Sequence, residues 1–113
     1  MVEKVTLEQL ERELENRDVT LVEALGPAYY EDAHLPGAIN IPHDRVEELA
    51  SRLLPDKDAR IVVYCASGPC QNSEIATRKL AKLGYTNVAD YHEGKAEWLE
   101  AGLPVERGAA VAA

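Results

Sequence analysis

The amino-acid sequence predicts an α/β domain built on a mainly parallel sheet. Segments with strand character alternate along the chain with segments of helical periodicity, and the loops between them are short. Residues 61–64 form an apolar or aromatic run, Ile-Val-Val-Tyr, which is typical of a strand buried on both faces. At 113 residues, we expect one domain over residues 1–107 and a disordered tail over residues 108–113.

The N-terminal segments give a helix, a strand and a short helix. Residues 6–9, Thr-Leu-Glu-Gln, form a capping box, and leucines at helical spacing then predict a helix that ends near residues 16–17. Residues 19–24 predict the first strand, which Gly26-Pro27 breaks. A short helix is expected over residues 28–33.

The middle of the chain predicts two strands, each followed by a helix. Residues 38–41 predict a short strand, and Asp44 is the expected cap of the helix that follows it. After the strand over residues 61–64, Ser73 is the expected cap of a helix that Gly84 ends.

The last elements are a strand over residues 87–91 and a helix over residues 94–101. Trp98 lies in this helix and is expected to pack in the core.

Composition and charge narrow the classes of function. The net charge is −8, with 20 acidic against 12 basic residues, which argues against a nucleic-acid surface. No apolar run approaches the roughly 18 residues of a membrane span, and the N-terminus lacks a signal-peptide pattern. We therefore expect a cytoplasmic protein without a membrane partner. Two cysteines do not make a secreted disulfide framework, so they indicate chemistry.

Cys65 directly follows the predicted central strand and precedes a loop that opens into a helix. Unpaired N–H groups and the positive end of the helix dipole favour a thiolate there, and the thiolate is the nucleophilic form. Ligands of parallel sheets also bind at the carboxyl ends of strands. On position alone, a structural cysteine packed in the strand is an equal alternative.

Several blocks of sequence resemble the rhodanese-like domain family. They are the stretch His-Leu-Pro-Gly-Ala over residues 34–38, the Tyr-Cys loop at residues 64–65 and Gly-Leu-Pro-Val over residues 102–105. The resemblance spans roughly residues 19–106, in the family's order. It implies a parallel sheet with helices on both faces.

The same resemblance implies sulfur transfer through a persulfide on Cys65. The sulfur donor would be a small sulfur-containing anion such as thiosulfate, a polysulfide or a protein persulfide, and the acceptor a thiol, cyanide or a protein. No metal or other cofactor is implied. The loop that would bind substrate consists of Ala66, Ser67, Gly68, Pro69, Cys70, Gln71, Asn72 and Ser73.

The chain departs from the common family pattern around this loop. The usual Asp-Val-Arg is Glu23-Ala24-Leu25, and the usual Gly-Gly before the last helix is Glu93-Gly94. The loop is longer, follows a Cys-x4-Cys-x2-Ser pattern and contains no Lys or Arg, so we expect dianionic thiosulfate to bind poorly. Glu23 is expected either to support the loop or to be a solvated carboxylate.

Three roles are open for Cys70. As a resolving thiol, it would attack the Cys65 persulfide and form a disulfide; as a bystander, it would do nothing. A zinc site ranks last, because the three histidines His34, His43 and His92 have no ligand spacing to support it.

Other side chains are expected to be structural. His34 is placed by the resemblance as a hydrogen-bonding residue rather than a base, and Arg78 and Lys79 are expected to be solvated.

Two other functions are to be weighed against sulfur transfer. A phosphatase or arsenate reductase also uses a cysteine loop, but it needs an Arg at the end of that loop to clamp the oxyanion, and no Arg occurs between Cys65 and Arg78. A non-catalytic sulfur-carrier or redox-sensing module that uses Cys65 and Cys70 remains the alternative.

Overall fold

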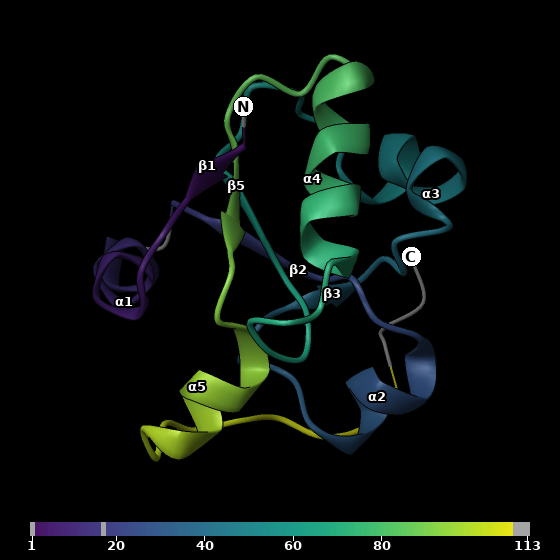
Figure 1. The fold of residues 1–113 in the computed structure, drawn as a ribbon. Helices are drawn as coiled ribbons and strands as arrows, with labels where there is room; N and C mark the ends of the chain where they lie inside the picture. Colours follow the sequence, from purple (N-terminus) through teal and green to yellow (C-terminus); the bar gives the residue numbers. More distant parts are fainter. Residues whose placement is uncertain (1, 17, 110–113) are drawn as a thin grey trace.

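The computed structural model describes residues 2–16 and 18–109, which form a five-stranded parallel sheet with helices on both faces (Figure 1). The strand order is β1-β5-β4-β2-β3, and every pairing is parallel. The strands are β1 (Glu3–Lys4), β2 (Thr20–Glu23), β3 (Ile39–Asn40), β4 (Ile61–Tyr64) and β5 (Val88–Tyr91).

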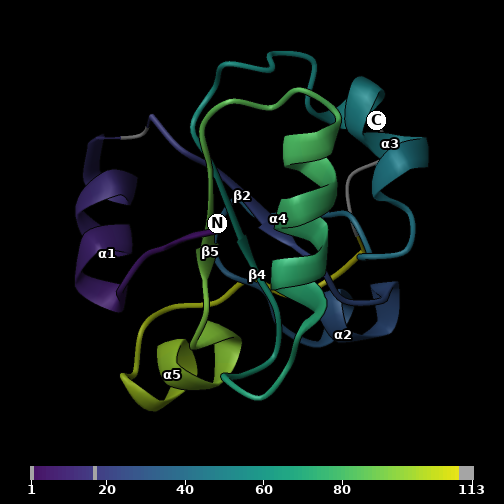
Figure 2. The same cartoon turned by 45° about the horizontal axis from the view of Figure 1, so that its top comes forward.

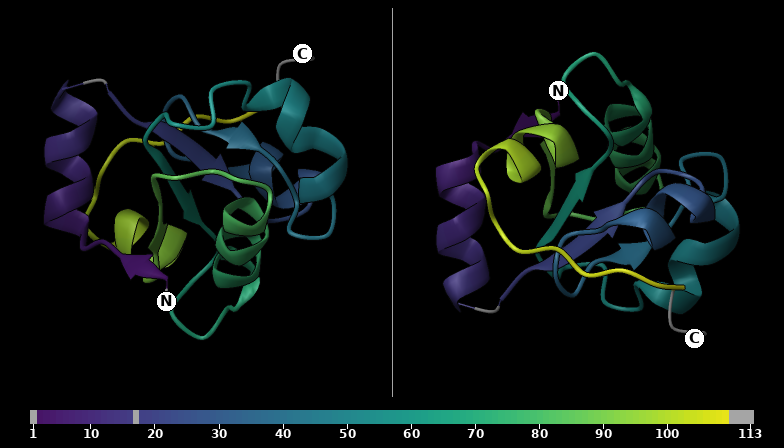
Figure 3. Two further views of the ribbon diagram at one scale, coloured as in Figure 1. Left: turned by 90° about the horizontal axis from the view of Figure 1, so that it is seen from above. Right: turned by 90° about the horizontal axis from the view of Figure 1, so that it is seen from below.

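The helices divide between the two faces of this sheet, as the resemblance implied. They are α1 (Leu7–Asn16), α2 (Pro27–Asp32), α3 (Val46–Leu53), α4 (Asn72–Lys82) and α5 (Gly94–Glu100). Residues of α3 and α4 share one buried apolar cluster, and residues of α1, α2 and α5 share the other. Figure 3 shows α1 and α3 at opposite ends of the sheet.

Strand β4 lies at the centre of the fold, and the prediction of a strand buried on both faces is confirmed. All four of its residues are buried. Ile61 and Val63 pack toward α3 and α4, whereas Val62 and Tyr64 pack toward the opposite helices. Because side chains alternate along a strand, one apolar run supplies both layers of the core.

Two sequence signals for the ends of helices are confirmed. Thr6 and Gln9 form the predicted capping box: the Thr6 N–H donates to Gln9 Oε1 at 2.8 Å, and the Gln9 N–H donates to Thr6 Oγ1 at 3.2 Å. Gly84 adopts φ +98° just after α4, which is the left-handed stop that the sequence predicts.

Two predicted helix caps are wrong. Asp44 lies in a turn closed by the Arg45 N–H and the Pro42 carbonyl, and α3 starts after Arg45 without a side-chain cap. Ser73 lies inside the first turn of α4, where it is buried, and Gln71 stands at the cap position. Ser73 is therefore free to make tertiary contacts.

The ends of the chain add two observations. Strand β1 was not predicted, because two exposed residues carry no periodicity. The Gly108 N–H donates to the Glu31 carbonyl at 2.9 Å, while residues 110–113 of the predicted tail lie outside the described residues. Within the described ranges, every helix is too short or too polar to cross a membrane.

Candidate active site

Cys65 directly follows β4, at the start of the loop that leads into α4. Figure 2 shows this loop between β4 and α4. The residue is fully buried. Its Sγ lies 3.4 Å from Ser73 Oγ and 3.6 Å from the Cys70 carbonyl oxygen. The carbonyl can only accept a hydrogen bond, so this contact fits a thiol rather than a thiolate.

The ionisation of Cys65 differs from the expectation. Burial raises the pKa of the Cys65 thiol, and the adjacent Cys70 raises it further, whereas the hydroxyl and backbone N–H of Ser73 lower it. The start of α4 thus lowers the pKa of the thiol, as expected, but burial raises it by more. Burial therefore outweighs the effect that the sequence predicted, and the pKa of Cys65 lies above its ordinary value.

The first turn of α5 holds the backbone of the loop. The Lys95 N–H donates to the Cys65 carbonyl at 2.9 Å, and the Ala96 N–H donates to the Ala66 carbonyl at 2.8 Å. Gly94 adopts φ +70°, and a Cβ there would lie 2.5 Å from the Cys65 carbonyl oxygen. Only glycine fits this close approach without displacing the loop.

A buried ion pair lies behind this contact. Glu23 is fully buried; its Oε2 lies 3.1 Å from Lys95 Nζ, and its Oε1 accepts a 2.8 Å hydrogen bond from the Tyr64 hydroxyl. Burial raises the pKa of Glu23, while Tyr64 and Lys95 lower it. Glu23 is therefore not a solvated carboxylate. That it supports the loop stays a prediction, and Lys95, which contacts both Glu23 and Cys65, is the residue that would link them.

The other loop residues lie nearer the surface. Ala66, Pro69 and Gln71 are exposed, and Ser67, Gly68, Cys70 and Asn72 are partly exposed. Ser67 and Gly68 line a hollow of about 520 Å³ together with three carboxylates, those of Glu93, Glu97 and Glu100. The surroundings of the loop are thus acidic.

Neither cysteine is in a disulfide, and Cys70 is partly buried. In residues 2–16 and 18–109, no group of three or more histidine, cysteine or acidic side chains is arranged to hold a metal ion.

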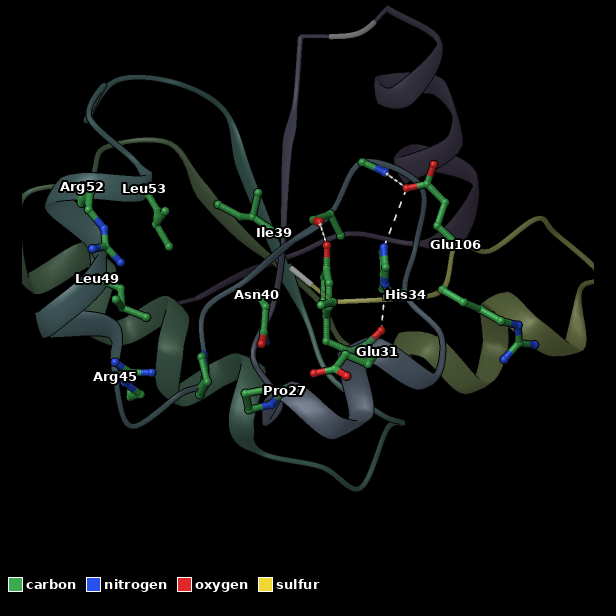
Figure 4. A pocket seen from close by; sticks show the side chains of 16 residues that line it. Pro27, Glu31, His34, Ile39, Asn40, Arg45, Leu49, Arg52, Leu53 and Glu106 are labelled. Carbon is green, nitrogen blue, oxygen red and sulfur yellow. Dashed lines mark hydrogen bonds and ion pairs between the residues drawn. The ribbon is translucent and has the colours of Figure 1, made fainter. Parts of the chain in front are cut away.

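A larger hollow of about 930 Å³ lies elsewhere, between α2, α3 and the edge strand β3 (Figure 4). His34 lines it and hydrogen-bonds, as predicted: its Nδ1 lies 2.8 Å from the Tyr30 carbonyl oxygen, and its ring stacks on Tyr30. No residue of the Cys65 loop lines this hollow.

Trp98, Arg78 and Lys79 differ in how far they are exposed. Trp98 is buried and donates its Nε1 hydrogen to the Pro104 carbonyl, so its core position is confirmed. Arg78 is exposed, as expected. Lys79 is only partly exposed and donates to the His43 carbonyl at 3.0 Å, so it is not simply solvated.

Sequence reasoning missed Asp90, near the end of β5. This aspartate is fully buried, and neither carboxylate oxygen has a hydrogen-bond partner among the described residues. Burial raises its pKa, while the Ser73 hydroxyl and His92 lower it. A charged residue inside the apolar pattern Val-Ala-Asp-Tyr was the signal that could have identified it.

Comparison with known proteins identifies the family. The model of the Rhodanese-like domain matches residues 6–101. A sulfurtransferase of Allochromatium vinosum is 31% identical over 93% of this chain and 95% of its own length. An HTH-type transcriptional regulator of Mycobacterium tuberculosis is 37% identical over 95% of this chain, which covers only 46% of that protein. The human single-domain sulfurtransferase TSTD1 superimposes with a TM-score of 0.78 at 25% identity, over 88% of this chain and 97% of that one. The chain belongs to the rhodanese-like domain family.

Proposed function

We propose that this domain is a sulfurtransferase that carries sulfane sulfur as a persulfide on Cys65. The observation that supports this most is the position of Cys65 at the carboxyl end of the central strand, with its carbonyl held by α5. The similarity to the A. vinosum sulfurtransferase covers nearly the whole of both chains. The proposed reaction needs no metal or other cofactor.

The reaction has two displacement steps. Cys65, once deprotonated, attacks the sulfane sulfur of the donor; the donor's bond to that sulfur breaks, and the leaving group keeps the electron pair. The acceptor, a thiol or cyanide, then attacks the outer sulfur of the persulfide. That S–S bond breaks, and its electron pair returns to Cys65 as a thiolate.

The charges around the loop favour neutral or thiol-bound donors over thiosulfate. The loop carries no cation, the adjacent hollow is lined by three carboxylates, and Lys95 is already paired with Glu23. A dianion therefore approaches against repulsion, which salt screens. Uptake from thiosulfate should become faster as ionic strength rises, whereas uptake from a neutral polysulfane should not. A low, salt-insensitive Michaelis constant for thiosulfate would contradict this preference.

We also propose that Cys70 acts as a resolving thiol. The loop folds so that the Cys70 backbone reaches the Cys65 sulfur, and both thiols are free. The Cys70 thiolate would attack the inner sulfur of the persulfide, form the Cys65–Cys70 disulfide and release sulfide with the electron pair of the broken bond. Cys70→Ala should then lengthen the lifetime of the persulfide. An unchanged lifetime, with no disulfide over the accessible redox range, would leave Cys70 without this role.

A sensing or carrier role is the second candidate. It is favoured by the similarity to the M. tuberculosis regulator and by the second cysteine in the loop. A sensor would hold its persulfide or disulfide without turnover in the presence of excess small acceptor, whereas a sulfurtransferase would be discharged repeatedly.

Intact-mass measurement after treatment with a sulfane donor tests the main proposal. The wild type should gain one sulfur atom, and cyanide or a thiol should remove it. Cys65→Ser should abolish both the adduct and turnover, while Cys70→Ser, the matched control, should still take up sulfur. An adduct that survives in Cys65→Ser and is lost in Cys70→Ser would reverse the assignment.

A further inference from the structure

The larger hollow contains an open edge of the sheet. Strand β3 is the last strand in the order and pairs with β2 on one side only. Its two residues, Ile39 and Asn40, both line the hollow of about 930 Å³. The edge of a sheet presents backbone N–H and C=O groups with which a further strand can pair. The hollow therefore offers a position for one more strand.

The backbone of Asn40 supplies the unpaired groups of this edge. The Ile41 N–H donates to the Glu23 carbonyl at 3.1 Å, so Ile41 turns its backbone groups toward β2. Successive residues of a strand turn these groups to opposite sides, and the N–H and C=O of Asn40 therefore point to the open edge. One step earlier, the Ala38 carbonyl already accepts a 2.6 Å hydrogen bond from the Tyr30 hydroxyl. The free stretch of edge is thus centred on Asn40.

Two helices flank this edge, one from each face of the sheet. Residues of α3 belong to the apolar cluster on one face, and Tyr30 of α2 belongs to the cluster on the other. Figure 4 shows Ile39 and Asn40 between two walls: an α3 wall with Arg45, Leu49, Arg52 and Leu53, and an α2 wall with Glu31, His34 and Glu106. A strand laid beside β3 would point alternate side chains at these two walls.

The α3 wall is basic and apolar. Arg45 and Arg52 are seven residues apart, which is about 10 Å along a helix, and two leucines lie on the same wall. Arg45 pairs with Glu48 at 2.8 Å, but this ion pair is exposed and therefore weak. Arg52 makes no ion pair within residues 2–16 and 18–109. Both guanidinium groups are thus available to acidic side chains.

The α2 wall is acidic. Glu106 is held in place there, because its Oε1 accepts a 2.9 Å hydrogen bond from the Gly37 N–H. Glu31 is the second carboxylate of this wall. Arg107 also lines the hollow, but its Nη1 donates to the Asp32 carbonyl. Two carboxylates therefore outnumber one guanidinium group, and the two walls differ in the sign of their charge.

We propose that this hollow binds an extended peptide segment of another protein, which adds to β3 as a sixth strand. Hydrogen bonds to the backbone of Asn40 hold the segment, and the two walls select its sequence. Acidic and apolar side chains of the segment lie against the α3 wall, and the basic side chains that alternate with them lie against the α2 wall. This charge pattern is complementary to that of the hollow.

The proposed binding site is separate from the sulfur site. No residue of the Cys65 loop lines the hollow, so a partner held at β3 leaves that loop uncovered. The proposal is therefore independent of the sulfur chemistry, and a protein that forms no persulfide would still test it.

Fluorescence anisotropy with two labelled peptides of identical composition tests the charge pattern. The first is Glu-Lys-Leu-Lys-Glu, acetylated and amidated, which places its acidic and apolar side chains on one side and its lysines on the other. The second is Glu-Glu-Leu-Lys-Lys, which mixes both charges on each side. The first should bind about 10-fold more tightly. Equal binding of the two, or no binding of the first at millimolar concentration, would overturn the proposal.

Charge reversal on the α3 wall tests the position of the peptide. Arg52→Glu should weaken binding of the first peptide about 3- to 10-fold, because attraction becomes repulsion. Arg12→Glu is the matched control: Arg12 is exposed on α1, which lies at the opposite end of the sheet from α3 (Figure 3). It makes the same change in net charge and should alter binding by less than about twofold. Equal losses in the two variants would contradict binding in the hollow.

Two measurements on the wild-type chain need no variant to fold. The bound peptide should slow exchange of the Asn40 backbone N–H with solvent, because that group becomes paired. Binding without this protection would overturn the added strand. Sedimentation should show no self-association through the hollow; a dimer that Arg52→Glu dissociates would assign the hollow to a second copy of this chain and overturn the proposed partner.

Discussion

Lys95→Met should destabilise the domain by roughly 3–5 kcal/mol, because it leaves a buried carboxylate without its cation. Lys95 Nζ lies 3.1 Å from Glu23 Oε2 and 3.0 Å from the Tyr29 carbonyl oxygen. The side chain of Glu23 is 0% exposed and that of Lys95 is 11% exposed, so water cannot replace the lost contact. The free energy of unfolding of a domain of this size is about 5–15 kcal/mol, so the loss is a large fraction of the total.

The loss should also depend on pH. Burial already raises the pKa of Glu23, and removal of Lys95 raises it further. The native variant therefore holds a proton at Glu23 that the unfolded chain releases, and its stability falls as pH rises through the native pKa. The destabilisation should be smallest below about pH 4, where Glu23 is protonated in both states.

Urea unfolding followed by the fluorescence of Trp98 measures this effect, because Trp98 is the single tryptophan and is buried. Combining Lys95→Met with Glu23→Gln should restore part of the lost stability, since no unpaired charge then remains. Arg45→Met, which breaks an exposed ion pair with Glu48, is the control and should change little. A cost below about 1 kcal/mol for Lys95→Met, or a double variant that loses the sum of both single effects, would refute the reasoning.

Three further variants test the surroundings of the loop. Gly94→Ala should slow Cys65 alkylation, because its Cβ would lie 2.5 Å from the Cys65 carbonyl oxygen. Gly102 has a similar positive φ but lies in open space, so Gly102→Ala is the control and should leave the alkylation rate unchanged. Equal alkylation rates in the two variants would contradict the importance of the close approach at Gly94. Tyr64→Phe should cost about 1–3 kcal/mol of unfolding free energy, because the buried carboxylate loses a 2.8 Å hydrogen bond, and a neutral result would count against that bond. Burial raises the native pKa of Asp90, so the free energy of unfolding of the wild type should fall as pH rises from about 4 through that pKa. Asp90→Asn should show a smaller fall. Parallel curves of unfolding free energy against pH would show that the ionisation of Asp90 does not destabilise the native state.

The sequence by itself determined the elements whose signals are local. The apolar run of residues 61–64 became the central strand, the capping box at residues 6–9 began α1, and Gly84 ended α4. It also located Cys65 at a strand end, because strand, cysteine and helix follow one another directly in the chain. Such features depend on neighbours a few residues away, which a single sequence displays.

Only the tertiary structure decided how charge is distributed around the sulfur. Glu23 and Lys95 are 72 residues apart in the chain, and no local pattern could pair them. Ser73 carried a cap signal, but it lies inside α4 with its hydroxyl toward Cys65. Whether Cys65 favours the thiol depends on how deeply its side chain is buried, and burial is a property of all the elements packed together.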